Sequence, residues 1–207
     1  MPSLFQRTVT TLLALAFLAT AAAEPPATAP PATAPAPYGG FTIPPELQPW
    51  MPQLEAAATT QLTAALNHAY ATHIARSQPL PAPVRDFLRG LLPDEVLNSA
   101  RYVVSSDEIT LPGVLNHGNR ELLGQDHAVS IENLIIFSRE PTFNRPGDAR
   151  WWAHELGHHV QYRRLGGVAG FAAEYVRNFQ ALEQEAESYG VRATQKYLET
   201  HAGGGNN

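Results

Sequence analysis

The chain has 207 residues, of which 44% are hydrophobic and 16% charged, enough for one ordinary domain with accessory segments. It carries 14 Lys and Arg against 19 Asp and Glu, and its net charge of -5 argues against a protein that binds nucleic-acid phosphates through a basic face. It contains no cysteine, which excludes disulfides, thiolate metal sites and cysteine nucleophiles. Any metal ion must therefore be held by His, Asp or Glu.

The first 23 residues have the pattern of a secretory signal peptide. Arg7 precedes an apolar core, Val9–Leu18, which is shorter than the ~20 residues that a membrane-spanning helix needs. The small residues Ala21–Ala23 predict cleavage after Ala23, with an uncleaved anchor as the alternative. We therefore expect a secreted, periplasmic or cell-envelope protein without a stable transmembrane segment after cleavage.

Two further segments have the composition of disordered chain. Residues 24–40 are rich in Pro, Ala and Thr, contain PPATAP twice, and predict a spacer that samples extended conformations. Residues 201–207 are rich in Gly and Asn and predict a disordered tail. The folded domain is accordingly expected at residues 41–200.

The predicted elements of this domain begin with helices and continue with strands. Apolar spacing predicts a long helix over Gln53–Arg76 and a short one over Val84–Leu91. Strands are expected at Arg101–Ser105, Ala128–Ile131 and Leu134–Phe137, the last two forming a hairpin around Glu132-Asn133.

From Asp148 to Thr200 the pattern is helical, with Asp148 as the expected N-cap and breaks at Gly166-Gly167 and near Asn178. The order of helices, small sheet and helices predicts an α+β domain, mostly helical, with a hairpin before the helix that begins at Asp148.

That helix contains the motif His154-Glu155-Leu156-Gly157-His158. Residues four apart lie on one face of a helix, so His154 and His158 can converge on a single cation. Glu155 then lies beside the metal, where it can accept a proton from an activated water. This is the HExxH arrangement of zincins, and it predicts one Zn²⁺ per chain with Glu155 as the catalytic base.

A catalytic zinc needs a third protein ligand. The metzincin pattern is excluded, because Gln161 and Arg164 stand where that class has glycine and histidine. The run Glu183-Gln184-Glu185-Ala186-Glu187 resembles the glutamate helix of gluzincins, which implies that Glu183 is the third ligand and that Glu187 bonds to His154 or His158. The alternatives are a solvated acidic face and, less favoured by its position on the helix, Glu185 as the ligand.

A longer stretch, roughly Pro79–Gly190, resembles the metallopeptidase domain family associated with extracellular contractile injection systems, the eCIS core domain. The resemblance rests on PLPAPVRDFLRGLLP, the strand RYVVS, the hairpin AVSIENLIIF and the helix segment WWAHELGHHVQY. It implies a zincin-like metallopeptidase fold. His159, in place of an apolar residue, and Glu132, in place of glycine, depart from the family pattern.

Two functions follow as hypotheses. The first is a secreted zinc metalloendopeptidase that acts on a peptide or protein substrate. The second is a non-catalytic zincin-fold module that binds or recruits effectors in a secretion or injection system; the intact Glu155 argues against it. The sequence leaves the oligomeric state and the oxyanion-stabilising residue open, with Tyr175 and Tyr189 as candidates for the latter.

The apolar strand Leu134, Ile135, Ile136 and Phe137 is a candidate for substrate binding. At the edge of the sheet it could pair with an extended peptide through main-chain hydrogen bonds. The alternative is a fully buried central strand, which an unbroken apolar run also permits.

Overall fold

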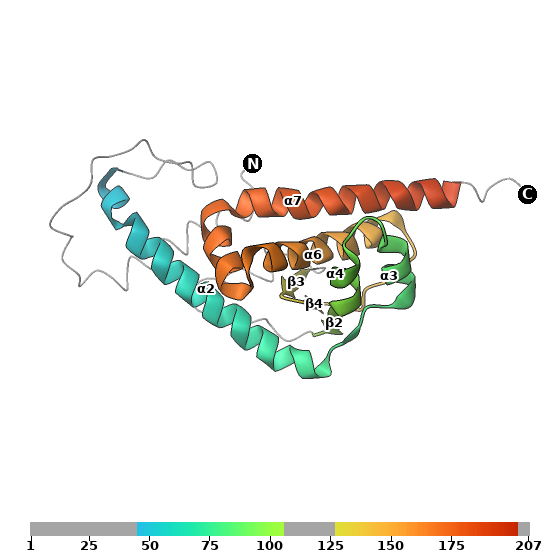
Figure 1. Cartoon of the computed structure of the whole chain (residues 1–207), viewed down its shortest axis with the longest axis horizontal. Coiled ribbons are helices and arrows are strands. Elements are labelled where there is room, and N and C mark those ends of the chain that lie inside the picture. Colours follow the sequence, from blue (N-terminus) through green and yellow to red (C-terminus); the bar gives the residue numbers. More distant parts are fainter. Residues whose placement is uncertain (1–44, 106–126, 203–207) are drawn as a thin grey trace, which may run out of the picture.

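The computed structural model describes residues 45–105 and 127–202. Their fold is α+β and mostly helical with one small sheet, which confirms the predicted class (Figure 1). The predicted signal peptide, its cleavage site and the linker lie outside the described residues. The last helix ends at Ala202 and so includes the first two residues of the predicted tail.

The helices follow the predicted pattern, and the structure adds η1 (Pro45–Trp50) and α4 (Asp94–Ser99), which the sequence did not predict. The long predicted helix is α2 (Met51–His73), preceded by the 3-10 helix η1 and followed by η2 (Ile74–Arg76). The short predicted helix is α3 (Ala82–Leu88), which precedes α4. The C-terminal half consists of α6 (Pro146–Leu165) and α7 (Val168–Ala202). Within the described residues, no helix is both long and apolar enough to cross a bilayer.

The predicted breaks between and within the last helices are confirmed. Gly166 and Gly167 have φ angles of 80° and 98°, a left-handed backbone that favours glycine and ends α6. Asn178 has non-helical angles and kinks α7. The predicted N-cap is wrong by three residues: α6 starts after Arg145, and the buried Asp148 lies in its first turn. There its carboxylate accepts hydrogen bonds from Thr142, Asn144 and Arg145.

Within the described residues, the sheet has four strands in the order β1-β2-β4-β3. They are β1 (Gln78–Pro79), β2 (Arg101–Val104), β3 (Ala128–Ile131) and β4 (Leu134–Phe137). β3 and β4 form the predicted hairpin, in which Glu132 takes a positive φ of 57° in the two-residue turn. β2 runs parallel to β4, and β1 is antiparallel to β2.

β4 is a central strand, so the prediction of an edge strand at Leu134–Phe137 is wrong. β2 and β3 flank it on either side. Each face of β4 packs into a core: Ile135 and Phe137 lie in one hydrophobic cluster, and Leu134 and Ile136 lie in the other. The unbroken apolar run reflects this burial on both faces. Among the described strands, β3 and not β4 forms the edge of the sheet at the hairpin.

Helix α6 lies between the sheet and α7 (Figure 1). Trp152 and Leu156 of α6 belong to the cluster that contains Phe137, and Tyr162 to the cluster that contains Ile136. The long helix α2 completes this second cluster with residues such as Leu62 and Leu66. As a result, both α6 and α7 are held firmly against the hydrophobic core.

The crossing of α6 and α7 depends on small residues. A Cβ atom added to Gly157 would lie 3.0 Å from the Cα of Ala186 and 3.0 Å from Cδ2 of Tyr189. The glycine inside the HExxH motif therefore lets the backbone of α7 approach α6 closely. Ala186 lies between the candidate ligand Glu183 and Glu187 on α7. This contact therefore helps to determine where both carboxylates lie relative to the histidines of α6.

We predict that Gly157→Ala lowers the free energy of unfolding by about 1–2 kcal/mol. Overpacking destabilises a fold by roughly 1–3 kcal/mol. The higher helix propensity of alanine offsets only part of this loss of stability. Gly147→Ala, also in α6, is the matched control, because its Cβ would meet nothing within 4 Å. Urea unfolding of both variants measures the difference. Equal stabilities would contradict the close contact at Gly157.

Candidate metal centre

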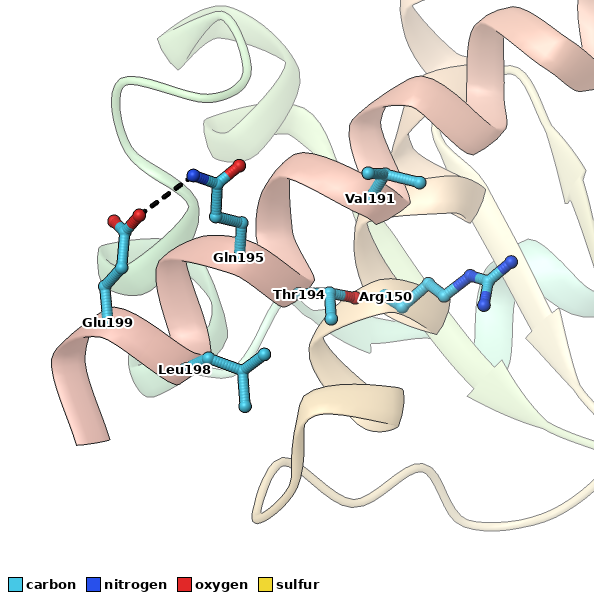
Figure 2. Close-up of a pocket in the computed structure, with 6 residues that line it drawn as sticks. All are labelled: Arg150, Val191, Thr194, Gln195, Leu198 and Glu199. Atoms are coloured by element: carbon cyan, nitrogen blue, oxygen red, sulfur yellow. Dashed lines mark hydrogen bonds between the residues drawn. The ribbon is translucent and has the colours of Figure 1, made fainter. Parts of the chain in front are cut away.

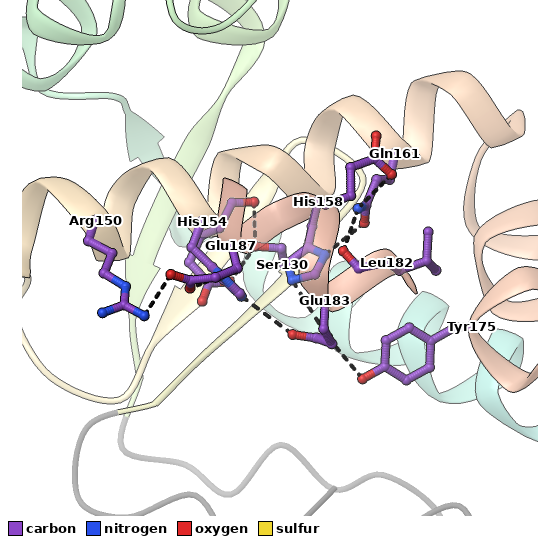
Figure 3. A network of polar contacts seen from close by, with 11 residues as sticks. Ser130, Arg150, His154, His158, Gln161, Tyr175, Leu182, Glu183 and Glu187 are labelled. Atoms are coloured by element: carbon purple, nitrogen blue, oxygen red, sulfur yellow. Dashed lines mark hydrogen bonds and ion pairs between the residues drawn. The ribbon is translucent and has the colours of Figure 1, made fainter. Parts of the chain in front are cut away.

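Helices α6 and α7 bring together the three predicted metal ligands. The Nε2 atom of His154 lies 3.5 Å from Oε2 of Glu183, and Nε2 of His158 lies 3.8 Å from Oε1 of the same carboxylate (Figure 3). One donor atom from each residue can be chosen so that all lie within 4.8 Å of one another. In a tetrahedral zinc site, ligand atoms are about 3.3 Å apart. To reach this spacing the donor atoms would have to come closer together, in the widest pair by up to about 1.5 Å.

The outer nitrogen of each histidine has its own partner. Nδ1 of His154 lies 3.5 Å from Oε2 of Glu187, whose other oxygen is 2.6 Å from the Arg150 guanidinium. Nδ1 of His158 lies 2.9 Å from Oε1 of Gln161. Of the two predicted partners for Glu187, the structure thus has His154. With acceptors at both Nδ1 atoms, the two Nε2 atoms face the centre, as metal-binding histidines require.

The charges of the cluster favour a cation. Burial by itself would lower the pKa of His154, but the hydrogen bond to Glu183 and the nearby carboxylates outweigh burial and raise this pKa. Burial would raise the pKa of Glu183, but the hydrogen bond with His154 and the charges of both histidines lower it. The carboxylates of Glu155, Glu183 and Glu187 thus surround two imidazoles, and a divalent ion would be strongly attracted there.

Glu155 is buried, with 6% of its surface exposed, next to the candidate ligand His154. The Ser130 hydroxyl on β3 lies 2.7 Å from its Oε2 atom and 3.0 Å from its backbone oxygen. Edge strand β3 therefore holds the carboxylate that the motif identifies as the base. The sequence signal for this contact was slight: a single polar residue in the otherwise apolar strand AVSI.

Only one of the two candidate tyrosines lies at the cluster. The Tyr175 hydroxyl is 3.3 Å from Oε1 of Glu183. Burial and the charge of Glu183 raise the pKa of Tyr175 well above its usual value, so it stays a phenol that can donate this hydrogen bond. The Tyr189 ring packs at the helix crossing beside Gly157 and under the Arg192 guanidinium.

Glu185, the alternative ligand, and His159, which follows His158, both lie outside this group of three. Glu185 points away from the histidines and pairs with Arg164 at 2.6 Å. His159 is 2% exposed, and burial, together with the neighbouring His158, lowers its pKa to about 3. Its ring is therefore neutral at ordinary pH and belongs to the packed core.

A separate groove of about 360 Å³ lies farther along α7 (Figure 2). Its lining is mostly apolar and comprises Arg150, Val191, Thr194, Gln195, Leu198 and Glu199. None of these is one of the three converging residues, but Arg150 also pairs with Glu187, so the groove adjoins the candidate centre without including it.

The chain matches no known family model, no curated protein and no solved structure.

Proposed function

We propose that this protein is a zinc-dependent metallopeptidase of the gluzincin type. One observation carries the proposal: His154, His158 and Glu183 converge through their metal-binding atoms, and the buried Glu155 carboxylate lies beside them. Two imidazole nitrogens and one carboxylate are the ligand set of many catalytic zinc sites, which keep a further position open.

The residues of the centre divide the chemistry between them. A zinc ion held by His154, His158 and Glu183 would activate a water molecule and polarise the peptide carbonyl. Glu155 accepts the proton from the attacking water and passes it to the leaving amine. Ser130 donates a hydrogen bond to one oxygen of Glu155 and leaves the other oxygen for this proton transfer.

The resemblance to the eCIS-associated metallopeptidase domain supports the same activity, as does the HExxH motif itself. The predicted signal peptide supports action outside the cytoplasm, in the cell envelope or after secretion. We infer a peptide or protein substrate, because the centre combines a base with a site for a carbonyl-polarising ion.

Edge strand β3, in place of β4, is the candidate for binding the substrate backbone. In an antiparallel pair, every second residue of a strand forms backbone hydrogen bonds with the neighbouring strand. The Ser138 N–H donates to the His127 backbone oxygen, so the backbone groups of His127 face β4. Backbone groups of Ala128 and Ser130 consequently point away from β4. A peptide that added to this edge would lie beside Ser130 and therefore beside Glu155.

We predict that Ala128→Pro impairs peptide cleavage mainly through a higher KM, because the substrate loses a main-chain donor while the ladder to β4 stays intact. Val129→Pro is the contrasting variant: it removes a donor that pairs with Ile136 and should destabilise the fold. Steady-state kinetics and thermal unfolding distinguish the two. An unchanged KM in a folded Ala128→Pro protein would place the substrate elsewhere.

Metal analysis and a chelator experiment test the proposed function. We expect one zinc per chain, hydrolysis of unfolded casein, loss of this hydrolysis with a strong chelator, and its return on adding zinc. Stoichiometric zinc without hydrolysis of casein or of a mixed peptide library would favour the non-catalytic recruitment module. A protein without zinc affinity would refute both forms of the hypothesis.

A further inference from the structure

The Gln161 side chain is a completely buried amide whose contacts the proposed reaction does not use. It lies on α6 one turn after His158 and is 0% exposed. Its Nε2 atom is 2.7 Å from the Leu182 backbone oxygen and 3.2 Å from Oε2 of Glu185. Its Oε1 atom is 2.9 Å from Nδ1 of His158. All its polar contacts therefore join α6, α7 and one candidate ligand.

These contacts determine which way the amide points. The Leu182 carbonyl has no proton to donate, and Glu185 is paired with Arg164, so both need a donor from Gln161. The NH₂ group must face them, which leaves the amide oxygen facing His158. Because that oxygen can only accept, Nδ1 of a neutral His158 must carry the proton. Its Nε2 atom then has a free lone pair directed at Glu183.

We propose that Gln161 is a positioning residue that holds His158 in its metal-binding tautomer and ties it to the backbone of α7 next to Glu183. The inference rests on the proposed metal site. Leu182 directly precedes Glu183, so one amide contacts both a histidine ligand and the chain segment that carries the carboxylate ligand. A displacement of α7 would break the bond to Leu182 and release the amide that orients His158.

The two histidines use different partners because their surroundings differ. The partner of His154 is a carboxylate, Glu187, which is partly exposed and neutralised by Arg150. Gln161 is fully buried. A second carboxylate there would add an unsolvated charge to a cluster that already holds Glu155 and Glu183, and a buried unpaired charge is costly. A neutral amide supplies the acceptor without this cost.

Two variants separate the orienting role from a purely structural one. Gln161→Met keeps the approximate volume and removes the acceptor at His158. Glu185→Gln is the matched control: it changes the other side of the same contact but leaves the Gln161 oxygen facing His158. We expect Gln161→Met to weaken zinc binding about 10–100-fold, as loss of such partners does. Glu185→Gln should stay within a few-fold of wild type. Equal losses in both would overturn the proposal.

Nitrogen-15 NMR of the histidine rings provides the second measurement, on the metal-free full chain at alkaline pH. Wild type and Glu185→Gln should show His158 protonated at Nδ1, and Gln161→Met should shift the proton towards Nε2. His154 is an internal control, because Glu187 is unchanged. A wild-type His158 protonated at Nε2 would refute the proposal whether or not the variants fold. Failure of the proposed function would show separately, as wild-type protein without zinc affinity.

Discussion

Replacing Glu155 by glutamine is expected to lower the rate of peptide hydrolysis by about 10²–10⁴-fold, the usual contribution of a general base. The amide cannot accept the proton of the attacking water, so the loss should fall on kcat. Its oxygen can still accept the hydrogen bond from Ser130, so the fold and the zinc content should be retained. Kinetics at saturating substrate, with zinc analysis of the same sample, measure both.

Glu174→Gln is the matched control for this experiment. Glu174 is also a carboxylate in the C-terminal half, but it bonds to Asn178 and not to the metal centre. We expect its activity to equal that of wild type. A Glu155→Gln protein that hydrolyses peptides as fast as wild type would exclude Glu155 as the base and favour the non-catalytic module.

Replacing Glu183 by alanine is expected to have the largest effect on zinc binding. Two histidines alone make a poor zinc site, because a catalytic zinc takes three protein ligands. The affinity should fall by more than the 10–100-fold that loss of an outer partner costs. Competition with a chromophoric chelator measures the dissociation constant, and circular dichroism of the metal-free protein verifies the fold.

The neighbouring glutamates give an ordered series of controls. Glu187→Ala should weaken zinc binding less than Glu183→Ala does, since Glu187 contacts the outer nitrogen of His154. Glu185→Ala should have the smallest effect, since Glu185 bonds to Arg164. A protein that keeps its zinc without Glu183 but loses it without Glu185 would mean that the wrong face of α7 has been assigned to the metal.

Local patterns predicted the elements of the fold well. The long helices, the hairpin and the breaks at Gly166-Gly167 and Asn178 depend on side chains close in sequence, so their signals are complete within a short window. The same holds for His154 and His158, which one helical turn places on one face. Helix α4 was missed because its six residues are too few for a clear period.

The position of β4 within the sheet could not be predicted, because an apolar run indicates that a strand is buried but does not indicate which strands pair with it. Burial on both faces is equally compatible with a central strand and with an edge strand covered by helices. The parallel pairing with β2 decides the question, and it joins segments more than thirty residues apart. Residues 101–104 carry no local signal that names residues 134–137 as their partner.

The sequence alone therefore placed His154 and His158 on one face of α6 with Glu155 next to them, because residues four apart in a helix share a face. Its resemblance to the glutamate helix of gluzincins also predicted Glu183 as a ligand and Glu187 as a partner of one histidine. Only the tertiary structure decided that α7 brings Glu183 to both histidines, that Ser130 holds Glu155 and that Gln161 holds His158. Each of these contacts joins different elements, and their relative placement results from packing around Gly157 and the two cores, which no local pattern encodes.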